Sequence, residues 1–403
     1  MEEWKEYKIG DIAKTNTSQY SLSENWETIQ YLDTGSITKN QISGIEEFFG
    51  NIDLPSRARR KVKHGDIVYS CVRPNLCHYG YIDNPPANLL VSTGFAVITV
   101  DPNIADARYI YYFLTQNNIV QSLHTIGEQA VSTYPSIKAS DIEDLSILLP
   151  SLPIQRQIAS ILSSLDDKIE LNRKINANLE AQAQALFKSW FVDFEPFKDQ
   201  PFVESELGMI PEGWRVGTLG EICNQSSIKV GCRNDVKVLS PVTTGNLMLS
   251  EEYFTKQVFS ESIAKYKVVT KGAFAYNPAR VNIGSLGRNE YDFDGAVSPV
   301  YVVFECKDGY ENFFDLYRRT ERFKTEVSLR AIGGVRQSLN YTDFAMIQTV
   351  IAPQNVIDAF NPLFDNIKVT QRHLEKENSR LASLRDTLLP RLMSGELKVN
   401  EVI

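Results

Sequence analysis

Two widely separated stretches of the chain carry an arginine and an asparagine at the same spacing. Arg73 precedes Asn75 in the first half, and Arg280 precedes Asn282 in the second. Arginine binds guanine and asparagine binds adenine through paired hydrogen bonds to the base edges of DNA. Because the two stretches match each other, the same residues could instead maintain a shared fold. Base contact is therefore a candidate chemistry with a structural alternative.

The highest local density of cations lies between residues 57 and 63. Five of these seven residues are basic, namely Arg57, Arg59, Arg60, Lys61 and Lys63. Clustered lysine and arginine neutralise the phosphates of nucleic acids, so we predict a phosphate contact here. A solvated loop or an outward-facing surface would have the same composition and is the alternative interpretation.

The remaining candidates for DNA contact lie on a predicted helix and in two glycine-containing loops. They are Arg318, Arg322, Arg336, Gln337 and Gln129. The first two belong to a helix predicted over residues 312–325, where they face either phosphate or water. The other three follow glycines in loops, where arginine and glutamine can reach base edges.

One short motif raises the possibility of an enzyme. Adenine methyltransferases use an Asn/Asp-Pro-Pro motif followed by an aromatic residue that stacks on the flipped base. Here Asn84-Pro85-Pro86 is followed by Ala87, so the stacking group is missing, and a proline turn is the favoured interpretation. We find no glycine-rich cofactor loop and no phosphate loop of the G-x4-G-K-S/T type. Neither the four histidines nor the five cysteines, which form no C-x-x-C pair, have the spacing of a metal site.

Composition limits where a nucleic acid could bind. The net charge is −8, and residues 1–150 carry 12 basic and 18 acidic side chains, whereas residues 201–350 carry 17 and 18. Since phosphate affinity depends on cations, any DNA-binding surface must be local, with the acidic residues facing elsewhere. No apolar run is long enough to span a bilayer, and the first residues lack a secretory pattern, so we expect a cytoplasmic protein.

The chain contains one pattern twice. Five blocks recur in the same order, at an offset that falls from 210 to 202 residues. The paired blocks begin at Trp4 and Trp214, Gly65 and Gly272, Val91 and Val297, Ile126 and Ile332, and Ser140 and Thr342. Chance does not produce five ordered matches, so the fold is a tandem repeat.

Each copy begins with about 150 residues of mixed character. Short β-rich runs bounded by Gly, Pro and Asn predict strands at residues 66–70, 95–100, 273–276 and 300–304. Helices are predicted at residues 108–115 and 312–325. Prolines then mark a break before a long helical pattern. We therefore divide the chain into a first recognition domain, a central helix, a second recognition domain and a C-terminal helix, at residues 1–150, 151–196, 197–352 and 353–403.

Both long helical patterns show a coiled-coil seam with spacings of four and three residues over more than four heptads. The first seam consists of Ile158, Leu162, Leu165, Ile169, Asn172, Asn176, Leu179, Ala183, Leu186 and Trp190. The second consists of Phe360, Phe364, Ile367, Gln371, Leu374, Asn378, Leu381, Arg385, Leu388 and Leu392. If the two helices pair, the chain must leave along one and return along the other, which makes them antiparallel. The alternative is that each helix packs only on its own domain.

Several segments give the whole chain a family resemblance. They are Pro153–Ile158 (PIQRQI), Leu165–Asn172 (LDDKIELN), Ala185–Phe194 (ALFKSWFVDF), Pro211–Trp214 (PEGW) and Leu388–Leu397 (LLPRLMSGEL). These segments resemble the specificity subunits of type I restriction–modification systems. The resemblance implies an α+β fold with two mixed α/β target-recognition domains in tandem repeat, separated by two long helices that form an antiparallel coiled coil.

The resemblance also implies partners. Such subunits bind double-stranded DNA, two methyltransferase subunits and restriction (translocase/nuclease) subunits, and hold no catalytic residues themselves. S-adenosylmethionine would then belong to the methyltransferase, and ATP and Mg to the restriction subunit. Two diverged domains on a helical spacer predict a bipartite, asymmetric DNA site whose half-sites lie about 34–36 Å, or one turn, apart. A self-contained methyltransferase and a protein–protein spacer without a DNA role are the alternatives.

Overall fold

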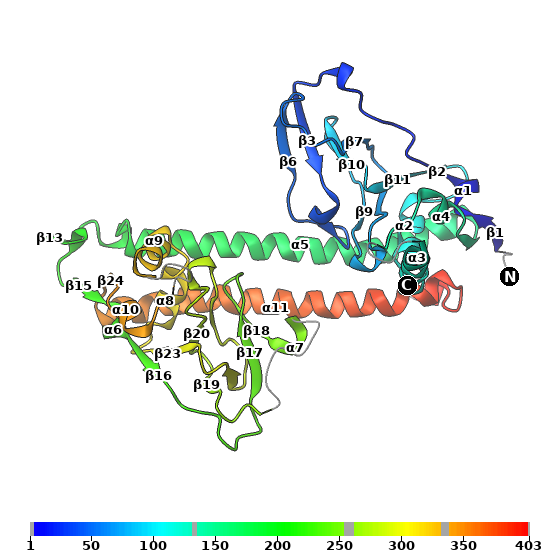
Figure 1. Ribbon diagram of the computed structural model, residues 1–403. Coiled ribbons are helices and arrows are strands. Elements are labelled where there is room, and N and C mark those ends of the chain that lie inside the picture. Colours follow the sequence, from blue (N-terminus) through cyan, green and yellow to red (C-terminus); the bar gives the residue numbers. More distant parts are fainter. Residues whose placement is uncertain (1–3, 131–134, 254–261, 332–337, 402–403) are drawn as a thin grey trace. The chain divides into compact units, whose positions relative to one another are not determined.

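The computed structural model describes residues 4–130, 135–253, 262–331 and 338–401, and the chain divides into two compact units (Figure 1). Unit 1 comprises Met1–Asn172 and Glu375–Ile403, and unit 2 comprises Arg173–Leu374. Each unit contains one copy of the repeat together with a segment of each long helix. The C-terminal segment of the chain therefore folds with the N-terminal repeat.

Two four-stranded sheets form the body of unit 1. The first has the strand order β2-β11-β8-β9, which are Ala13–Thr15, Phe95–Val100, Ile67–Ser70 and Tyr79–Tyr81. The second has the order β6-β3-β10-β7, which are Glu46–Phe49, Thr28–Leu32, Leu89–Ser92 and Ala58–Lys61. Strands β3 and β10 are parallel, and the other neighbours are antiparallel. A two-stranded ladder joins β1 (Lys5–Lys8) to β12 (Ser146–Leu149).

Sheet β2-β11-β8-β9 lies between two apolar cores. Successive residues of a strand point to opposite faces. Accordingly, Ile67 and Tyr69 lie in one core and Val68 in the other. The first of these cores also contains α2 (Ala107–Thr115), whereas the second lies toward the other sheet. Burial on both faces explains why these strands appear in the sequence as nearly continuous apolar runs.

Unit 2 repeats this topology strand for strand. Its first sheet has the order β16-β23-β20-β21, which are Cys223–Ser226, Val302–Cys306, Phe274–Tyr276 and Leu286–Arg288. Its second has the order β18-β17-β22-β19, which are Leu247–Leu249, Lys237–Pro241, Gly295–Val297 and Lys267–Val269. Strands β17 and β22 are parallel, like their counterparts, and β15 (Arg215–Thr218) pairs with β24 (Gln348–Ile351). The tandem repeat predicted from the sequence is confirmed.

One predicted helix of unit 2 is in fact two. The prediction of a single helix over residues 312–325 is wrong, because α8 (Glu311–Tyr317) ends and α9 (Glu321–Arg330) starts again after a short break. Thr320 causes the restart, since its hydroxyl accepts a hydrogen bond from the backbone N–H of Phe323. A threonine in this position satisfies one of the free N–H groups of a new first turn.

Two helices of 40 residues each, α5 (Leu152–Phe191) and α11 (Gln354–Met393), pass through both units. Each is about 60 Å long at 1.5 Å per residue. In unit 1 they run antiparallel, because Asp166 pairs with Arg385 while Asn172, further along α5, binds Asn378, earlier along α11. The predicted seam positions are all buried or half-buried, so the coiled-coil prediction is confirmed.

The ends of the long helices also belong to the domain cores. In unit 1, Ile158 and Leu162 of α5 share a core with Leu392 of α11. In unit 2, Phe187 of α5 and Phe360 of α11 share the core that contains α8. The first turns of each long helix therefore pack on the helix's own repeat, as the alternative predicted, whereas its last turns complete the core of the other repeat.

We expect Leu392→Ala to destabilise unit 1 although Leu392 lies far from that domain in sequence. Leu392 is fully buried, and truncation of a buried leucine costs about 2–5 kcal/mol because a cavity remains. Leu384→Ala on the same helix is the matched control, since Leu384 is 45% exposed, and should change the free energy of unfolding by less than about 0.5 kcal/mol. Urea unfolding, monitored by hydrogen exchange of the unit 1 amides, measures the free energy of unfolding of both variants. Equal losses of stability in the two variants would contradict the assignment of this helix end to the unit 1 core.

Candidate nucleic-acid interface

The predicted base-contacting pair of unit 1 lies in an exposed loop between β8 and β9. Arg73 and Asn75 are both exposed, and Arg73 has a positive φ of 48°. The loop rests on the two-residue turn at Lys39 and Asn40, whose backbone N–H groups donate to the carbonyls of Cys77 and Tyr79 at 2.8 Å each. Gly80 allows this contact, because a Cβ there would lie 2.9 Å from the Asn40 amide oxygen and closer still to Ile37.

The matching pair of unit 2 lies in the equivalent loop between β20 and β21. Both residues are exposed; Arg280 directly precedes the short helix Val281–Ile283, and Asn282 lies within it. This loop packs on the turn that connects β17 to β18, with a Cβ on Gly287 only 2.4 Å from the Asn246 backbone. The matched glycines Gly80 and Gly287 therefore serve this close approach, whereas the matched arginines and asparagines remain at the surface.

The cationic stretch 57–63 does not form one continuous basic surface. Its centre is strand β7, whose residues alternate between two faces. Lys61 lies 2.5 Å from Glu24 and above the ring of Trp26, and Arg59 donates to the carbonyl of Ala58. Arg60 is half-buried and donates to the carbonyl of Thr93, and its burial lowers the pKa of the guanidinium. Arg57 and Lys63, at the two ends, are exposed.

The structure contradicts the assignment of Arg318 to DNA contact. Its side chain is only 8% exposed and forms an ion pair with the fully buried carboxylate of Asp315 at 2.6 Å. Its Nη1 donates to the backbone carbonyls of Gly245 and Leu286, both at 3.0 Å. A guanidinium with these partners cannot also bind phosphate. The sequence prediction failed because the helix break at this point turns Arg318 inward.

The other predicted contact residues are either exposed or lie outside the described part of the chain. Arg322 is exposed on α9, and Gln129 is exposed near the end of α3 (Asn117–Ala130). Arg336 and Gln337 lie outside the described residues. Arg322 and Gln129 thus remain surface candidates, and the helices that carry them pack against the short helices of the arginine and asparagine loops.

A buried ionic network lies behind the arginine and asparagine loop of unit 2. Asp315 is contacted by Arg318 and by Arg319, and Arg319 extends to Glu180 of α5 at 2.5 Å. Burial by itself raises the pKa of Asp315, but the charges of Arg318 and Arg319 outweigh it and leave the pKa well below its usual range. Asp315 is therefore a carboxylate that neutralises two arginines in the interior.

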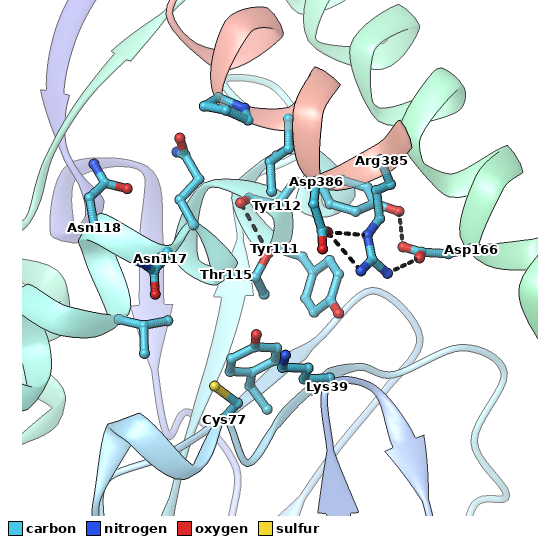
Figure 2. A pocket seen from close by; sticks show the side chains of 15 residues that line it. Lys39, Cys77, Tyr111, Tyr112, Thr115, Asn117, Asn118, Asp166, Arg385 and Asp386 are labelled. Atoms are coloured by element: carbon cyan, nitrogen blue, oxygen red, sulfur yellow. Dashed lines mark hydrogen bonds and ion pairs between the residues drawn. The ribbon is translucent and has the colours of Figure 1, made fainter. Parts of the chain in front are cut away.

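Unit 1 has a cavity of about 550 Å³ in the corresponding region (Figure 2). Figure 2 shows Lys39 and Cys77 on one side and Arg385, held between Asp166 and Asp386, on the other. The Tyr112 hydroxyl donates to Asp166 at 2.7 Å, and burial together with Asp166 raises the pKa of Tyr112, so the hydroxyl stays protonated. The network ties α2 to both long helices within unit 1.

The Asn84-Pro85-Pro86 segment forms a turn. Asp83 binds His64 at 3.0 Å and lies 3.6 Å from Arg108, while the backbone N–H of Asn84 donates to His64. Asn84 has a positive φ of 43°, as in tight turns. Among the described residues, no group of three or more His, Cys, Asp or Glu side chains is arranged to hold a metal ion. Within the same residues, no helix is long and apolar enough to cross a membrane.

Comparison with known proteins points to one family. Residues 1–181 match the family model of the type I restriction modification DNA specificity domain. Along 98% of this chain, sequence identity is 27% to the HindI specificity subunit of Haemophilus influenzae, all of which is covered, and 26% to the MjaIX specificity subunit of Methanocaldococcus jannaschii, of which 93% is covered. Residues 1–181 thus contain the specificity domain of this family, and nearly the whole chain is similar to type I restriction–modification specificity subunits.

A solved structure agrees with this fold. The type I restriction–modification S subunit from M. genitalium has a TM-score of 0.53 to this chain at 16% identity, with 97% of this chain and 96% of that chain covered. The resemblance in architecture therefore extends through both repeats and both long helices. The tandem α+β architecture expected from the sequence holds for this chain.

Sequence reasoning missed the residues that support the arginine and asparagine loops. Lys39 and Asn40 form a tight turn with positive φ at both residues, but a lysine at the first position hid the usual Asn-Gly pattern. Asp315 and Glu180 looked like ordinary acidic residues of amphipathic helices. Their role depends on cations that are distant in the chain or lie at a helix break, which no periodicity indicates.

We expect Asp315→Asn to destabilise the folded chain most at neutral pH. Because the folded-state pKa of Asp315 is lowered, its charge stabilises the fold above the unfolded-state pKa, about 3.9, and this contribution is lost as pH falls below it. The variant should lose about 3–5 kcal/mol at neutral pH, with the difference from the parent shrinking in acid. Asp292→Asn, in an exposed pair with Lys271, is the control and should change stability little at either pH. Urea unfolding at several pH values measures this, and a pH-independent difference would contradict it.

Proposed function

We propose that this specificity subunit binds a bipartite, asymmetric DNA site through its two repeats and recruits an adenine-N6 methyltransferase and restriction subunits to it. The observation that carries the proposal is the recurrence of one loop in both units, with an exposed arginine and asparagine in each copy. One chain thus carries two similar reading surfaces of different sequence. Each would contact one half-site, and their divergence makes the two half-sites different.

The chemistry of the loops suits the major groove. Arg73 and Arg280 can bind guanine through two hydrogen bonds, and Asn75 and Asn282 can bind adenine in the same way. A rigid loop matters because a bidentate contact tolerates little displacement of either partner. The turns packed behind both loops, through Gly80 and Gly287, supply that rigidity.

Phosphate contacts would come from exposed cations. Arg57 and Lys63 flank strand β7, and Arg322 lies on α9. Only these local cations are needed, which reconciles DNA binding with a net charge of −8. The acidic surface elsewhere would restrict productive docking of DNA to the reading side.

In this proposal the paired helices set the distance between the half-sites and provide the docking surface for two methyltransferase subunits. Methyl transfer from S-adenosylmethionine, and the ATP- and Mg-dependent steps of restriction, belong to the partner subunits. The chain would act in the cytoplasm, where its DNA and its partners meet. A self-contained methyltransferase at Asn84-Pro85-Pro86 is disfavoured, because the motif forms a turn beside an Asp83–His64 contact and is followed by Ala87.

The deciding experiment is sequencing of N6-methyladenine in cells that express this gene with its neighbouring methyltransferase gene. We expect a split, asymmetric methylated motif whose half-sites lie about one DNA turn apart. Cells with the methyltransferase gene alone are the control and should lack the motif. An active methyltransferase without any new motif would refute the function, and a continuous motif would refute the bipartite assignment.

We expect Arg57→Ala combined with Lys63→Ala to weaken DNA binding similarly for all sequences. Each lost phosphate contact lowers the salt dependence, the slope of log K against log salt, by about 0.9. Lys5→Ala with Lys14→Ala, two other exposed cations of unit 1, is the matched control. Titration of the assembled complex with duplex DNA at several salt concentrations measures the slopes. Equal slopes for the two double variants would remove Arg57 and Lys63 from the interface.

A further inference from the structure

Arg318 occupies a buried position directly behind the reading loop of unit 2. Its Nε and Nη2 donate to Asp315 at 2.9 and 2.6 Å. The remaining terminal nitrogen, Nη1, donates to two backbone carbonyls, those of Gly245 and Leu286. The guanidinium is thus fully engaged, with one half bound to a carboxylate and the other half bound to two separate segments of backbone.

The two carbonyls belong to the segments that shape the reading loop. Leu286 ends the loop that carries Arg280 and Asn282, and Gly245 lies in the turn on which this loop rests. The loop and the turn meet through backbone, since a Cβ on Gly284 would lie 2.6 Å from the Thr243 carbonyl oxygen. The Ser285 hydroxyl adds a 2.7 Å hydrogen bond to the carbonyl of Pro241. Arg318 therefore binds both the reading loop and the turn, the two segments that meet in this backbone contact.

The other end of the network reaches the long helices within unit 2. Asp315 is shared with Arg319, which binds Glu180 of α5. Asn312 of α8 donates to Asp365 of α11 and accepts from Arg288, which lies two residues beyond Leu286. The reading loop is consequently connected to α5 and to α11 through fully or partly buried polar contacts.

We propose that Arg318 is a positioning residue that determines the specificity of unit 2 without touching DNA. By fixing the Gly245 and Leu286 carbonyls, it holds the Arg280–Asn282 loop in the one geometry that reads the correct bases. The proposal rests on the proposed function, because it assigns the accuracy of one half-site to a residue in the interior. Loss of Arg318 releases the loop, and the half-site read by unit 2 becomes degenerate.

Unit 1 provides an internal reference for this assignment. There the turn at Lys39 and the loop residue Cys77 border the cavity of Figure 2, and the arginine across this cavity, Arg385, binds Asp166 and Asp386 and not the carbonyls of the loop and the turn. The helix that matches α8 is α2, whose one charged residue, Arg108, lies near Asp83 and Asp167. The half-site read by unit 1 therefore does not depend on an arginine of this kind.

The test uses Arg318→Met in the full-length chain with its methyltransferase partner. Methionine is long enough to fill much of the space but cannot bind the carbonyls, and Asp315 keeps its ion pair with Arg319. Arg215→Met is the matched control, because Arg215 also forms an ion pair in unit 2, with Glu221, but is exposed. Sequencing of N6-methyladenine then compares the motifs of parent, variant and control.

We expect Arg318→Met to reduce the preference for the correct base by about tenfold, equivalent to about 1.4 kcal/mol, at positions confined to one half-site. The other half-site and the control should keep the parental motif. Uniform loss of methylation without a change in the motif would show a merely structural role and overturn the proposal. Equal relaxation of both half-sites would also overturn it.

Hydrogen exchange of the purified chain supplies a readout that does not depend on methylation. Arg318→Met should accelerate exchange at the amides of Gly245 and Ser285, whose N–H groups bond to Val242 and Arg280 in the parent. The control variant should leave these amides unchanged. Unaltered exchange in Arg318→Met would refute the positioning role. If the parent with its methyltransferase partner does not methylate a bipartite site, the proposed function is refuted, while the exchange result still decides the role of Arg318.

Discussion

The antiparallel seam between α5 and α11 is the contact on which both units depend. Each helix of 40 residues contributes one end to each unit, so neither repeat completes its core with residues of its own copy alone. In unit 1 the last turns of α11, with Leu389, Leu392 and Met393, fill the core begun by the N-terminal strands. Because burial of these side chains requires the returning helix, the core of the first repeat is complete only when the last turns of α11 are in place.

Polar residues interrupt the apolar seam and fix the register in which the two helices pair. Asn172 is fully buried and donates to Glu377 at 2.7 Å and to Asn378 at 2.9 Å, and Arg385 binds Asp166 nearby. Buried polar groups stabilise less than apolar ones, but they penalise every alternative register in which they lose their partners. The same reasoning applies to Asp315, because an arrangement that separates it from Arg318 and Arg319 leaves a buried charge without a partner.

The interface could be predicted in part. The matched spacing of Arg73 with Asn75 and Arg280 with Asn282 correctly indicated equivalent positions, which both lie in exposed loops, while their contact with bases stays a prediction. The local density of charge predicted exposed DNA-contact residues less well than the matched spacing did. The stretch from 57 to 63 is divided by strand alternation and by the Glu24 contact, and Arg318 faces the interior. Charge in a sequence does not reveal which partner a flexible side chain will find, since that partner comes from elsewhere in the chain.

The sequence by itself determined the tandem repeat, the two long helices and the family resemblance, because these depend on periodicity or on local motifs, whereas it left open whether the two helices pair with each other. Only the tertiary structure decided that the chain end completes the first unit, that the loop glycines Gly80 and Gly287 permit backbone contact, and that Arg318 supports a loop from within. These features arise from contacts between residues separated by tens to hundreds of positions. A local pattern of hydrophobicity or charge carries no information about such contacts, whereas packing fixes them through shape and hydrogen-bond satisfaction.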